Sequence, residues 1–286
     1  MDTNQSPFGT DALLPQEMAE KSERIGAEKS RMPVLRLLTL AVLAGAFIAL
    51  GAVFSTLATV SAEGYLPYGL IRVLAGLTFS LGLILVVVGG AELFTGNNLM
   101  VMAWAGGKIS LADMLRAWTL VFIGNFIGAV ATAVMVFLAG VHGNGDAMVG
   151  VVALNIAEAK AALPFFQALM RGVLGNVLVC LAVWMCYSAR TTTDRILSVV
   201  PPVTAFVALG FEHSVANMFI LPYGLLIKGW AAPDFWTAIQ RSPESFEMLS
   251  WGSLLTNLAP VTIGNVIGGG VMVGAVYWSA YLRHRP

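Results

Sequence analysis

Two stretches of this sequence place a glutamate and an asparagine among glycines, deep within apolar residues. The stretches are residues 90–97 and 210–217, and their polar residues are Glu92, Asn97, Glu212 and Asn217. An ionisable side chain is costly inside a membrane and usually has a function there. Two apolar segments interrupted by glycine at corresponding positions point to a substrate site near the middle of the bilayer. The pattern therefore predicts a duplicated membrane transporter or channel.

His213 stands directly after Glu212 in the second stretch. Histidine titrates near neutral pH, so its side chain can offer an N–H group or a proton to a small anion. Thr95 of the first stretch is the expected partner, because a hydroxyl group can hold the imidazole ring in one orientation. The alternative is that His213 is a hydrogen-bonded packing residue that no substrate contacts.

The two glutamates allow either a proton relay or a structural role. One stands in each stretch, beside backbone N–H groups that a helix break would free, and a carboxylate there would accept those hydrogen bonds. We favour the structural role. Four asparagines are expected to serve the broken backbone in the same way: Asn97 and Asn217 within the stretches, and Asn125 and Asn265 in a second repeated pattern.

The composition is that of a membrane protein. Of the 286 residues, 57% are hydrophobic and 11% are charged, and a formal net charge of zero gives no reason to expect a nucleic acid partner. The two cysteines, Cys180 and Cys186, lie in one apolar segment without metal-ligand spacing, so we expect neither a metal nor another cofactor. Six apolar segments approach or exceed the ~20 residues that span a bilayer as a helix. They are residues 34–60, 68–105, 112–140, 163–188, 195–228 and 253–282.

These segments predict an all-α polytopic membrane protein with six transmembrane helices. The second and fifth segments are too long and too polar for one straight helix, and each is expected to break, near 89–97 and 209–214. Three spans in each half, 34–140 and 163–282, give the halves opposite directions across the membrane, which is an inverted repeat.

The ends of the chain are polar. Residues 1–33 form an N-terminal segment, either a surface helix that begins near Pro15 or a plain cytoplasmic tail, and residues 283–286 form a short C-terminal tail. The first 30 residues lack an apolar core, so no cleavable signal peptide is expected.

Lys and Arg placement predicts the orientation, because cytoplasmic loops of membrane proteins carry an excess of these residues. With the N-terminus inside, most of the 16 Lys and Arg residues are cytoplasmic. The inner group is Lys21, Arg24, Lys29, Arg31, Arg36, Lys108, Arg116, Arg190, Arg195, Arg283 and Arg285, and the outer group is Arg72, Lys160, Arg171, Lys228 and Arg241. Both termini are therefore expected in the cytoplasm.

Three ordered motifs resemble the signatures of the formate/nitrite transporter family. They are residues 87–96, residues 172–182 and residues 210–219, which surround the position of the family's central histidine. The resemblance covers about residues 10 to 283. It implies a homopentamer of aquaporin-like protomers in the inner (plasma) membrane of a bacterium, each with its own pore for a small monovalent anion.

The same resemblance implies roles for individual residues. His213 is similar to the central histidine, with Thr95 opposite, and anion contacts in the vestibules are implied at Lys160, Asn176 and Asn265. Narrowings of the pore are implied toward the outside at Phe79 and Phe206, and toward the inside at Leu83, Leu93 and Phe94. Hydrophobic constrictions of this kind gate by excluding water.

Within the family, the chain looks most like the formate channels. Phe211 before Glu212, the run from Asn217 to Pro222 and the long loop 229–252 carry this likeness. We therefore expect a channel that passes formate, either passively or coupled to protons. Nitrite is the alternative within the family, followed by hydrosulfide, lactate and acetate.

Two other classes of protein fit less well. A membrane enzyme could use Ser214 with His213, but no Gly-x-Ser-x-Gly elbow surrounds Ser214, and no third residue is placed to orient the histidine. A water or glycerol channel would carry a pair of Asn-Pro-Ala motifs, which the sequence lacks. We expect a channel and not an enzyme.

Overall fold

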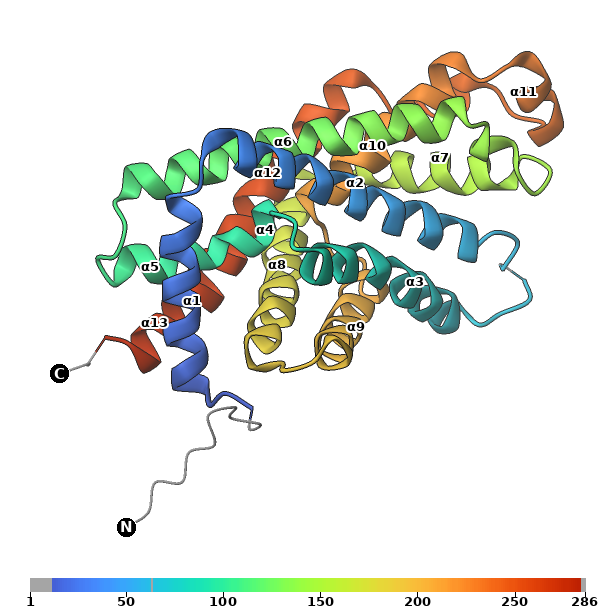
Figure 1. Ribbon diagram of the computed structural model, residues 1–286. Coiled ribbons are helices and arrows are strands. Elements are labelled where there is room, and N and C mark those ends of the chain that lie inside the picture. Colours follow the sequence, from blue (N-terminus) through green and yellow to red (C-terminus); the bar gives the residue numbers. More distant parts are fainter. Residues whose placement is uncertain (1–11, 63, 284–286) are drawn as a thin grey trace, which may run out of the picture.

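The computed structural model describes residues 12–62 and 64–283, and its regular structure there consists of helices (Figure 1). The longer helices are α1 (Pro15–Ser30), α2 (Val34–Ala58), α3 (Tyr68–Gly89), α6 (Leu111–Leu138), α7 (Met148–Ala161), α8 (Phe165–Ser188), α9 (Thr192–Ala208), α10 (Ser214–Trp230) and α12 (Trp251–Val266). The shorter segments are α4 (Phe94–Asn97), η1 (Asn98–Met100), α5 (Val101–Ala105), η2 (Val141–Gly143), α11 (Pro233–Ile239), η3 (Pro243–Ser245), η4 (Ile267–Ala275) and α13 (Val276–Tyr281). The all-α class is confirmed. Predictions for residues 1–11 and 284–286, the outermost parts of both tails, lie outside the described residues.

Five continuous helices are long and apolar enough to cross a bilayer. They are α2, α3, α6, α8 and the helix that runs from α12 through η4 into α13, with 25, 22, 28, 24 and 31 residues. A sixth crossing is reached if α10 and α11, which meet at an angle of 103°, count as one span. The predicted segment 195–228 corresponds to α9 and α10, each of 17 residues. The described chain is thus a multi-pass membrane protein.

Both predicted helix breaks are present. α3 ends at Gly89, and Gly90 follows with a φ of 76° before residues 91–93 lead into α4. α9 ends at Ala208, and Gly210, with a φ of 71°, leads into α10. A left-handed residue commonly ends a helix, and glycine adopts this conformation without a steric penalty. The repeated glycines therefore determine where α3 and α9 stop.

Capping residues determine where other helices begin. Ser110 and Asp113 form a capping box at the start of α6, and Thr191 and Asp194 form one at the start of α9. In each box the hydroxyl group accepts a hydrogen bond from the backbone N–H of the aspartate, and the carboxylate accepts one from the N-cap backbone. Two backbone groups that the helix leaves unpaired are satisfied in this way at each start.

Close helix packing repeats in the two halves. Gly128 of α6 lies against the backbone carbonyl of Val42 in α2, and Gly268 lies against the backbone carbonyl of Val173 in α8. A Cβ atom at either glycine would collide with that carbonyl, so these helices approach closely because the residue is small. The shared contact makes Val42 and Val173 corresponding residues of the two halves.

Two helical elements differ from the six predicted segments. α7 lies in the connection between the halves and packs on α10, and its 14 residues are too few to span a bilayer. The last predicted segment contains η4, a π-helix of 9 residues, instead of a uniform α-helix. Its three consecutive glycines, Gly268 to Gly270, carry no side chain that a wider helical turn would have to accommodate.

The N-terminal segment contains a helix that begins at Pro15, as one of the two sequence alternatives predicted. Its residues Met18 and Ala19 are buried in a cluster with Met102 and Trp184. α1 and α13 pack together at one end of the molecule, while α11 lies at the other end (Figure 1). The described parts of both chain ends therefore lie on the same side.

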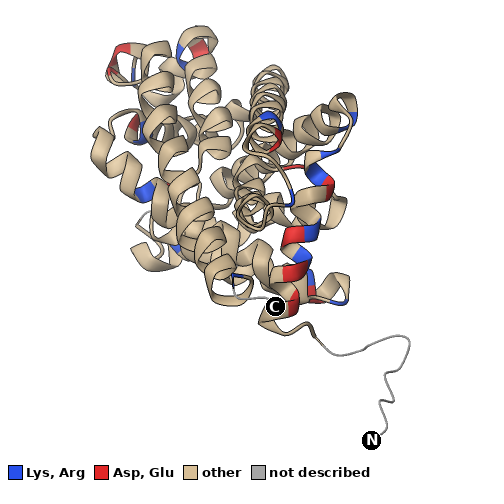
Figure 2. Cartoon of the chain, turned by 90° about the vertical axis from the view of Figure 1, so that its left-hand side faces the viewer, with Lys and Arg blue, Asp and Glu red and all other residues tan. Residues whose placement is uncertain are grey.

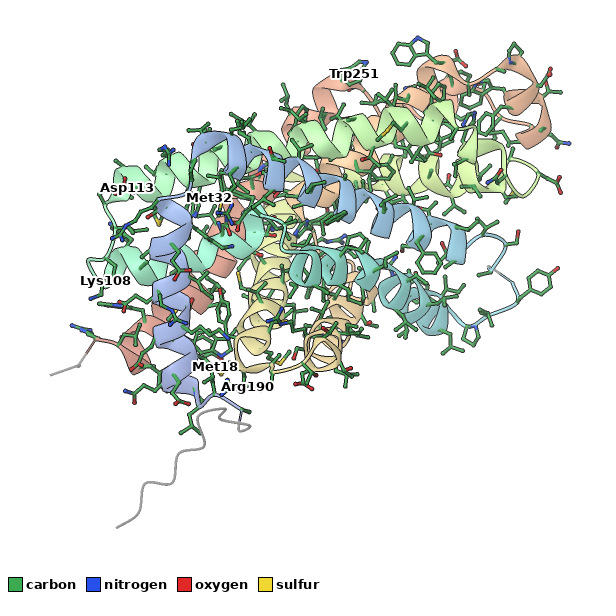
Figure 3. All side chains as sticks on the ribbon, in the orientation of Figure 1. Met18, Met32, Lys108, Asp113, Arg190 and Trp251 are labelled. Atoms are coloured by element: carbon green, nitrogen blue, oxygen red, sulfur yellow. The ribbon has the colours of Figure 1, made fainter. Side chains whose placement is uncertain are left out.

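Charged residues occupy few parts of the molecule. Figure 2 shows most of the ribbon in tan, with red and blue concentrated in a few stretches, α1 among them. In Figure 3, Met18, Lys108 and Arg190 lie toward the end that holds α1, and Trp251 lies far from it. This distribution is typical of a chain whose central part faces lipid or protein.

Gly268→Ala tests the close packing of α12 and η4 on α8. The added methyl group would collide with the carbonyl of Val173, which cannot rotate away, so we expect the free energy of unfolding to fall by about 1–3 kcal/mol. Gly69→Ala is the control, because nothing lies within 4 Å of a Cβ atom built at Gly69 in α3. Thermal unfolding in detergent compares the variants, and equal melting temperatures would contradict the packing argument.

Candidate functional site

Asn125 of α6 connects the first break to α2. Its amide nitrogen donates to the carbonyls of Ala41 at 2.7 Å and Glu92 at 2.9 Å. Its amide oxygen accepts from the backbone N–H of Phe94, the first residue of α4, at 2.9 Å. Because Asn125 is fully buried, this one side chain bonds backbone groups that water cannot reach.

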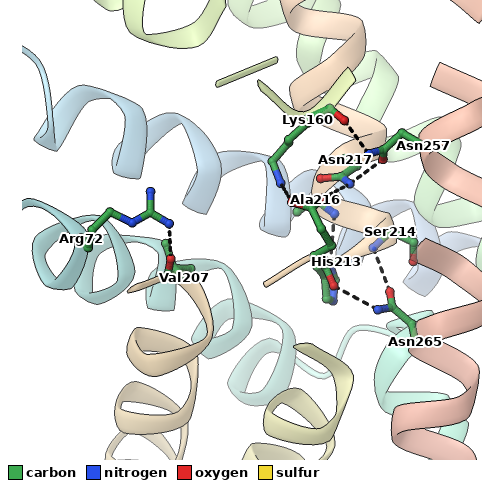
Figure 4. A network of polar contacts seen from close by, with 10 residues as sticks. Arg72, Lys160, Val207, His213, Ser214, Ala216, Asn217, Asn257 and Asn265 are labelled. Carbon is green, nitrogen blue, oxygen red and sulfur yellow. Dashed lines mark hydrogen bonds and ion pairs between the residues drawn. The ribbon is translucent and has the colours of Figure 1, made fainter. Parts of the chain in front are cut away.

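Asn265 of α12 makes the same set of bonds at the second break. Its amide nitrogen donates to the carbonyls of Gly172 at 2.8 Å and Glu212 at 3.0 Å. Its amide oxygen accepts from the backbone N–H of Ser214 at 2.9 Å, the bond drawn between these residues in Figure 4. Both the nitrogen and the oxygen of the Asn265 amide are therefore hydrogen-bonded to protein.

Glu92 is buried at the first break and is paired with a lysine. The Nζ atom of Lys29, from α1, lies 2.9 Å from Oε2 of Glu92 and donates to Oδ1 of Asn97 at 2.7 Å. The amide nitrogen of Asn97 donates to the same carboxylate at 2.9 Å. The three side chains form a closed polar group in which the carboxylate has both a charge partner and a hydrogen-bond donor.

Glu212 has the corresponding partners at the second break. Nζ of Lys160, from α7, lies 2.7 Å from Oε1 of Glu212, and the amide nitrogen of Asn217 donates to Oε2 at 2.6 Å. Figure 4 shows Lys160, Asn217 and Asn257 close together here, and Asn217 also donates to Asn257 at 2.7 Å. Removing one partner of such a buried ion pair lowers the free energy of unfolding by about 3–5 kcal/mol. These contacts therefore hold α7 to the break.

The two lysines occupy corresponding positions, each shortly before the first residue of its half. Leu40 and Arg171 correspond, because their carbonyls accept from the backbone N–H groups of Glu92 and Glu212. Lys29 precedes Leu40 by as many residues as Lys160 precedes Arg171. The repeat therefore includes α1 and α7, which sequence analysis did not place in it, and this equal spacing was the signal that could have shown it.

Arg72 of α3 is a further residue of the second break that the sequence did not single out for this role. Its Nη2 atom donates to the carbonyl of Val207 at 2.5 Å, as drawn in Figure 4, and its Nε atom to that of Ala208 at 3.3 Å. These carbonyls end α9, where a positive side chain also meets the negative end of the helix dipole.

His213 is the N-cap of α10 and contacts Thr95 from the other break. Its Nδ1 atom accepts from the backbone N–H of Ala216 at 3.1 Å, and its Nε2 atom lies 2.8 Å from Oγ1 of Thr95. An acceptor at Nδ1 carries no proton, so these hydrogen bonds assign the neutral ring a proton on Nε2, which it donates to Thr95. The two residues are 2% and 0% exposed.

Two residues of α8, Asn176 and Cys180, lie next to Thr95. The amide nitrogen of Asn176 donates to the carbonyl of Asn265 at 2.6 Å and to Oδ1 of Asn98 at 2.7 Å. The thiol of Cys180 donates to the carbonyl of Thr95 at 3.2 Å. Asn176 is fully buried, and its contacts join α8, η1 and α12 inside the protein.

A small cavity lies beside His213. Its volume of about 10 Å³ is close to the space that one water molecule requires. The lining residues come from both halves and are Ile48, Phe79, Leu83, Leu93, Val179, Val203, Phe206 and His213. Phe94 is the one proposed narrowing residue outside this set. Its ring packs on those of Trp118 and Phe122, with centroid distances of 6.2 and 5.1 Å.

Comparison with known proteins extends over nearly the whole chain. The pattern of the family described as formate/nitrite transporter matches residues 16–279. The formate channel FocA of Escherichia coli (strain K12) is 44% identical over 279 residues, which cover 97% of this chain and 97% of that protein. The formate channel FocA of Haemophilus influenzae is 38% identical, over 92% of this chain and 93% of its own length.

Solved structures share the fold. A structure described as a pentameric formate channel with formate bound has a TM-score of 0.83 and 41% sequence identity, covering 87% of this chain and 98% of its own. An FNT family ion channel has a TM-score of 0.78 and 27% identity, over 92% of this chain and 98% of its own. The residues matched by the family pattern include both breaks, Thr95 and His213, and the chain belongs to the formate/nitrite transporter family.

Proposed function

We propose that this protein is a channel for formate, with a pore through each protomer. The observation that carries the proposal is the Thr95–His213 pair, a polar contact beside an otherwise apolar cavity between two helix breaks. The likeness to named formate channels from two bacteria supports formate as the substrate. Nitrite, and after it hydrosulfide, lactate and acetate, are the alternatives.

The cavity is closed to ions in this conformation. Apart from His213 its walls are hydrocarbon, and both nitrogens of His213 are bonded to other residues. A bare anion that entered would lose its hydration without compensation, at a prohibitive cost in free energy. Passage therefore requires a hydrogen-bond donor, and the Nε2–H group that now faces Thr95 is the donor at this cavity.

Formate takes over the Nε2–H bond of His213 as it passes, and Thr95 accepts that bond again when formate leaves. A neutral ring that gave up this proton entirely would become an imidazolate. Neutral His213 therefore donates a hydrogen bond to the anion and keeps its proton. Proton transfer to the anion requires His213 to be protonated on Nδ1 first, which breaks the bond from Ala216.

Residues at the two breaks support this pathway. The anion contact that the resemblance implies at Lys160 stays a prediction. Lys29 and Lys160 neutralise Glu92 and Glu212, so that neither carboxylate repels an approaching anion. Asn97 and Asn217 hold the same carboxylates. Phe79 and Phe206, whose ring centroids are 6.1 Å apart, form one apolar narrowing, and Leu83 and Leu93 form the other.

The chain lies in the inner membrane of a bacterium with both ends in the cytoplasm. This orientation rests on the Lys and Arg distribution and on the position of α1 and α13 at one end of the molecule. The halves 34–140 and 163–282 then run in opposite directions, and the matching bonds of Asn125 and Asn265 support the repeat itself.

The working form is a homopentamer. The similar solved structure is described as pentameric, and large apolar side chains such as Leu35, Leu138 and Leu255 are 79%, 76% and 70% exposed on α2, α6 and α12. Lipid and neighbouring protomers cover these faces.

Variants at the polar pair test the mechanism. His213→Phe keeps an aromatic ring but removes the donor, and initial formate uptake into proteoliposomes should fall about tenfold or more, as expected for a lost hydrogen bond to a charged group. Thr95→Val should lower uptake less, because it removes only the resting acceptor. Thr95→Ser keeps the hydroxyl group and should resemble the wild type. Equal uptake by wild type and His213→Phe would show that His213 is a packing residue, and faster uptake of nitrite than of formate would contradict the substrate assignment.

Labelling of single cysteines tests the orientation. Cys180 and Cys186 are buried, so both are first replaced by alanine, and Lys108→Cys or Asn144→Cys is added at exposed positions beyond the two ends of α6. In intact spheroplasts, a membrane-impermeant maleimide should label Asn144→Cys and reach Lys108→Cys only after lysis. The reverse pattern would place the N-terminus outside.

The mass in detergent tests the assembly. Light scattering, corrected for bound detergent, should give about five times the chain mass of 30.3 kDa. A purified monomer that transports formate at the wild-type rate would refute the pentamer as the working form.

A further inference from the structure

The side chains that line the cavity beside His213 differ in how freely they can change rotamer. Phe79, Leu83, Leu93 and Phe206 can change rotamer and move aside. Ile48, Val179 and Val203 are β-branched and lie within helices, where one χ1 rotamer strongly predominates. A cavity of about 10 Å³ accommodates one water molecule and no larger ion, so the passage must widen when formate enters. The movable side chains supply this widening, and the β-branched side chains remain as fixed walls.

Ile48 and Val179 are the same wall position in the two halves. Val42 and Val173 correspond through their contacts with Gly128 and Gly268, and Ile48 and Val179 lie equally far beyond them along α2 and α8. Both are buried, with exposures of 2% and 3%. Two corresponding, rigid side chains, one from each half, therefore line the cavity.

Val179 is linked to the polar pair through its neighbour in the chain, Cys180. The next residue, Cys180, donates to the carbonyl of Thr95, and Thr95 contacts His213. An anion that accepts the Nε2–H bond of His213 thus has its carboxylate end fixed, and its carbon substituent must fit in the space that the fixed walls leave.

We propose that Val179, together with Ile48, sets the largest carboxylate that the pore passes. This inference rests on the proposed function of the pore as a formate channel. Formate carries a hydrogen atom where acetate carries a methyl group and lactate a larger substituent. Val179→Ala removes two methyl groups from a wall that cannot otherwise move, and so makes room for the methyl group of acetate.

Truncation of a movable side chain has a different effect. Phe79 and Phe206 already leave the path by rotation when an anion passes, so a smaller residue there changes the uptake of all anions together. Only truncation of a fixed wall residue changes the uptake of a larger anion relative to that of a small one. The ratio of acetate to formate uptake is therefore the quantity that separates the two kinds of residue.

The experiment measures initial uptake of labelled formate and labelled acetate into proteoliposomes with wild type, Val179→Ala, Val179→Ile and Val177→Ala. Val177→Ala is the matched control, because Val177 is a half-buried valine of the same helix that packs with Leu99 and Val273 and does not line the cavity. The acetate-to-formate ratio should rise about tenfold or more in Val179→Ala, the usual effect of one methylene group in an apolar pocket. It should fall in Val179→Ile and stay at the wild-type value in Val177→Ala.

An unchanged ratio in Val179→Ala, or an equal rise in Val177→Ala, would overturn the inference while leaving formate transport by the wild type intact. Wild-type protein that takes up no formate would instead overturn the proposed function and the inference with it. If Val179→Ala does not fold, Ile48→Val decides the question, because it removes one methyl group from the other corresponding wall residue. That variant should raise the ratio, and an unchanged ratio there would refute the proposal.

Discussion

Backbone groups freed by a helix break inside a bilayer have no water to bond, and the structure is organised around this constraint. Asn125 and Asn265 meet it in the same way, each with two donated hydrogen bonds and one accepted. Each asparagine joins three parts of the chain: its own helix, the break, and the neighbouring helix α2 or α8. The breaks therefore cannot shift unless the close packing at Gly128 and Gly268 is also undone. The same arrangement fixes the positions of Thr95 and His213.

The function arises where the two halves differ. Leu93 and His213 occupy corresponding positions, each directly before the residue whose backbone N–H binds the asparagine. Nδ1 of His213 accepts from Ala216 and so caps α10, whereas the side chain of Leu93 makes no cap hydrogen bond to α4. Thr95 has no hydroxyl counterpart, because the corresponding residue is Val215. One break thus carries the ring and the other the hydroxyl group, and their contact creates a single donor site from a repeated scaffold.

The sequence was informative about the backbone and less so about the side-chain environment. Glycines and carboxylates in apolar sequence located both breaks, because few other reasons place such residues in a membrane segment. The internal contacts of Asn176 were not predicted, since its partners Asn98 and Asn265 come from elements distant in the sequence. Ile48 and Val179 were not anticipated, because a helix that is apolar all round does not reveal which face lines a pore. The ion pairs could not be predicted, because they form only where α1 and α7 approach the breaks, and hydropathy does not show this approach.

These ion pairs also determine what can select a substrate. A lone carboxylate at a break would repel an anion, and a lone lysine would bind it too tightly to let it leave, whereas conduction needs attraction that is weak. Lys29 and Lys160 are paired with Glu92 and Glu212 at 2.9 and 2.7 Å, with side-chain exposures of 25% and 16%. Each pair is nearly neutral at a distance, and an anion feels the ammonium group only close by. With a neutral His213 beside the cavity, charge distinguishes one small carboxylate from another only slightly, so the selection among them falls to the apolar cavity and its fixed walls.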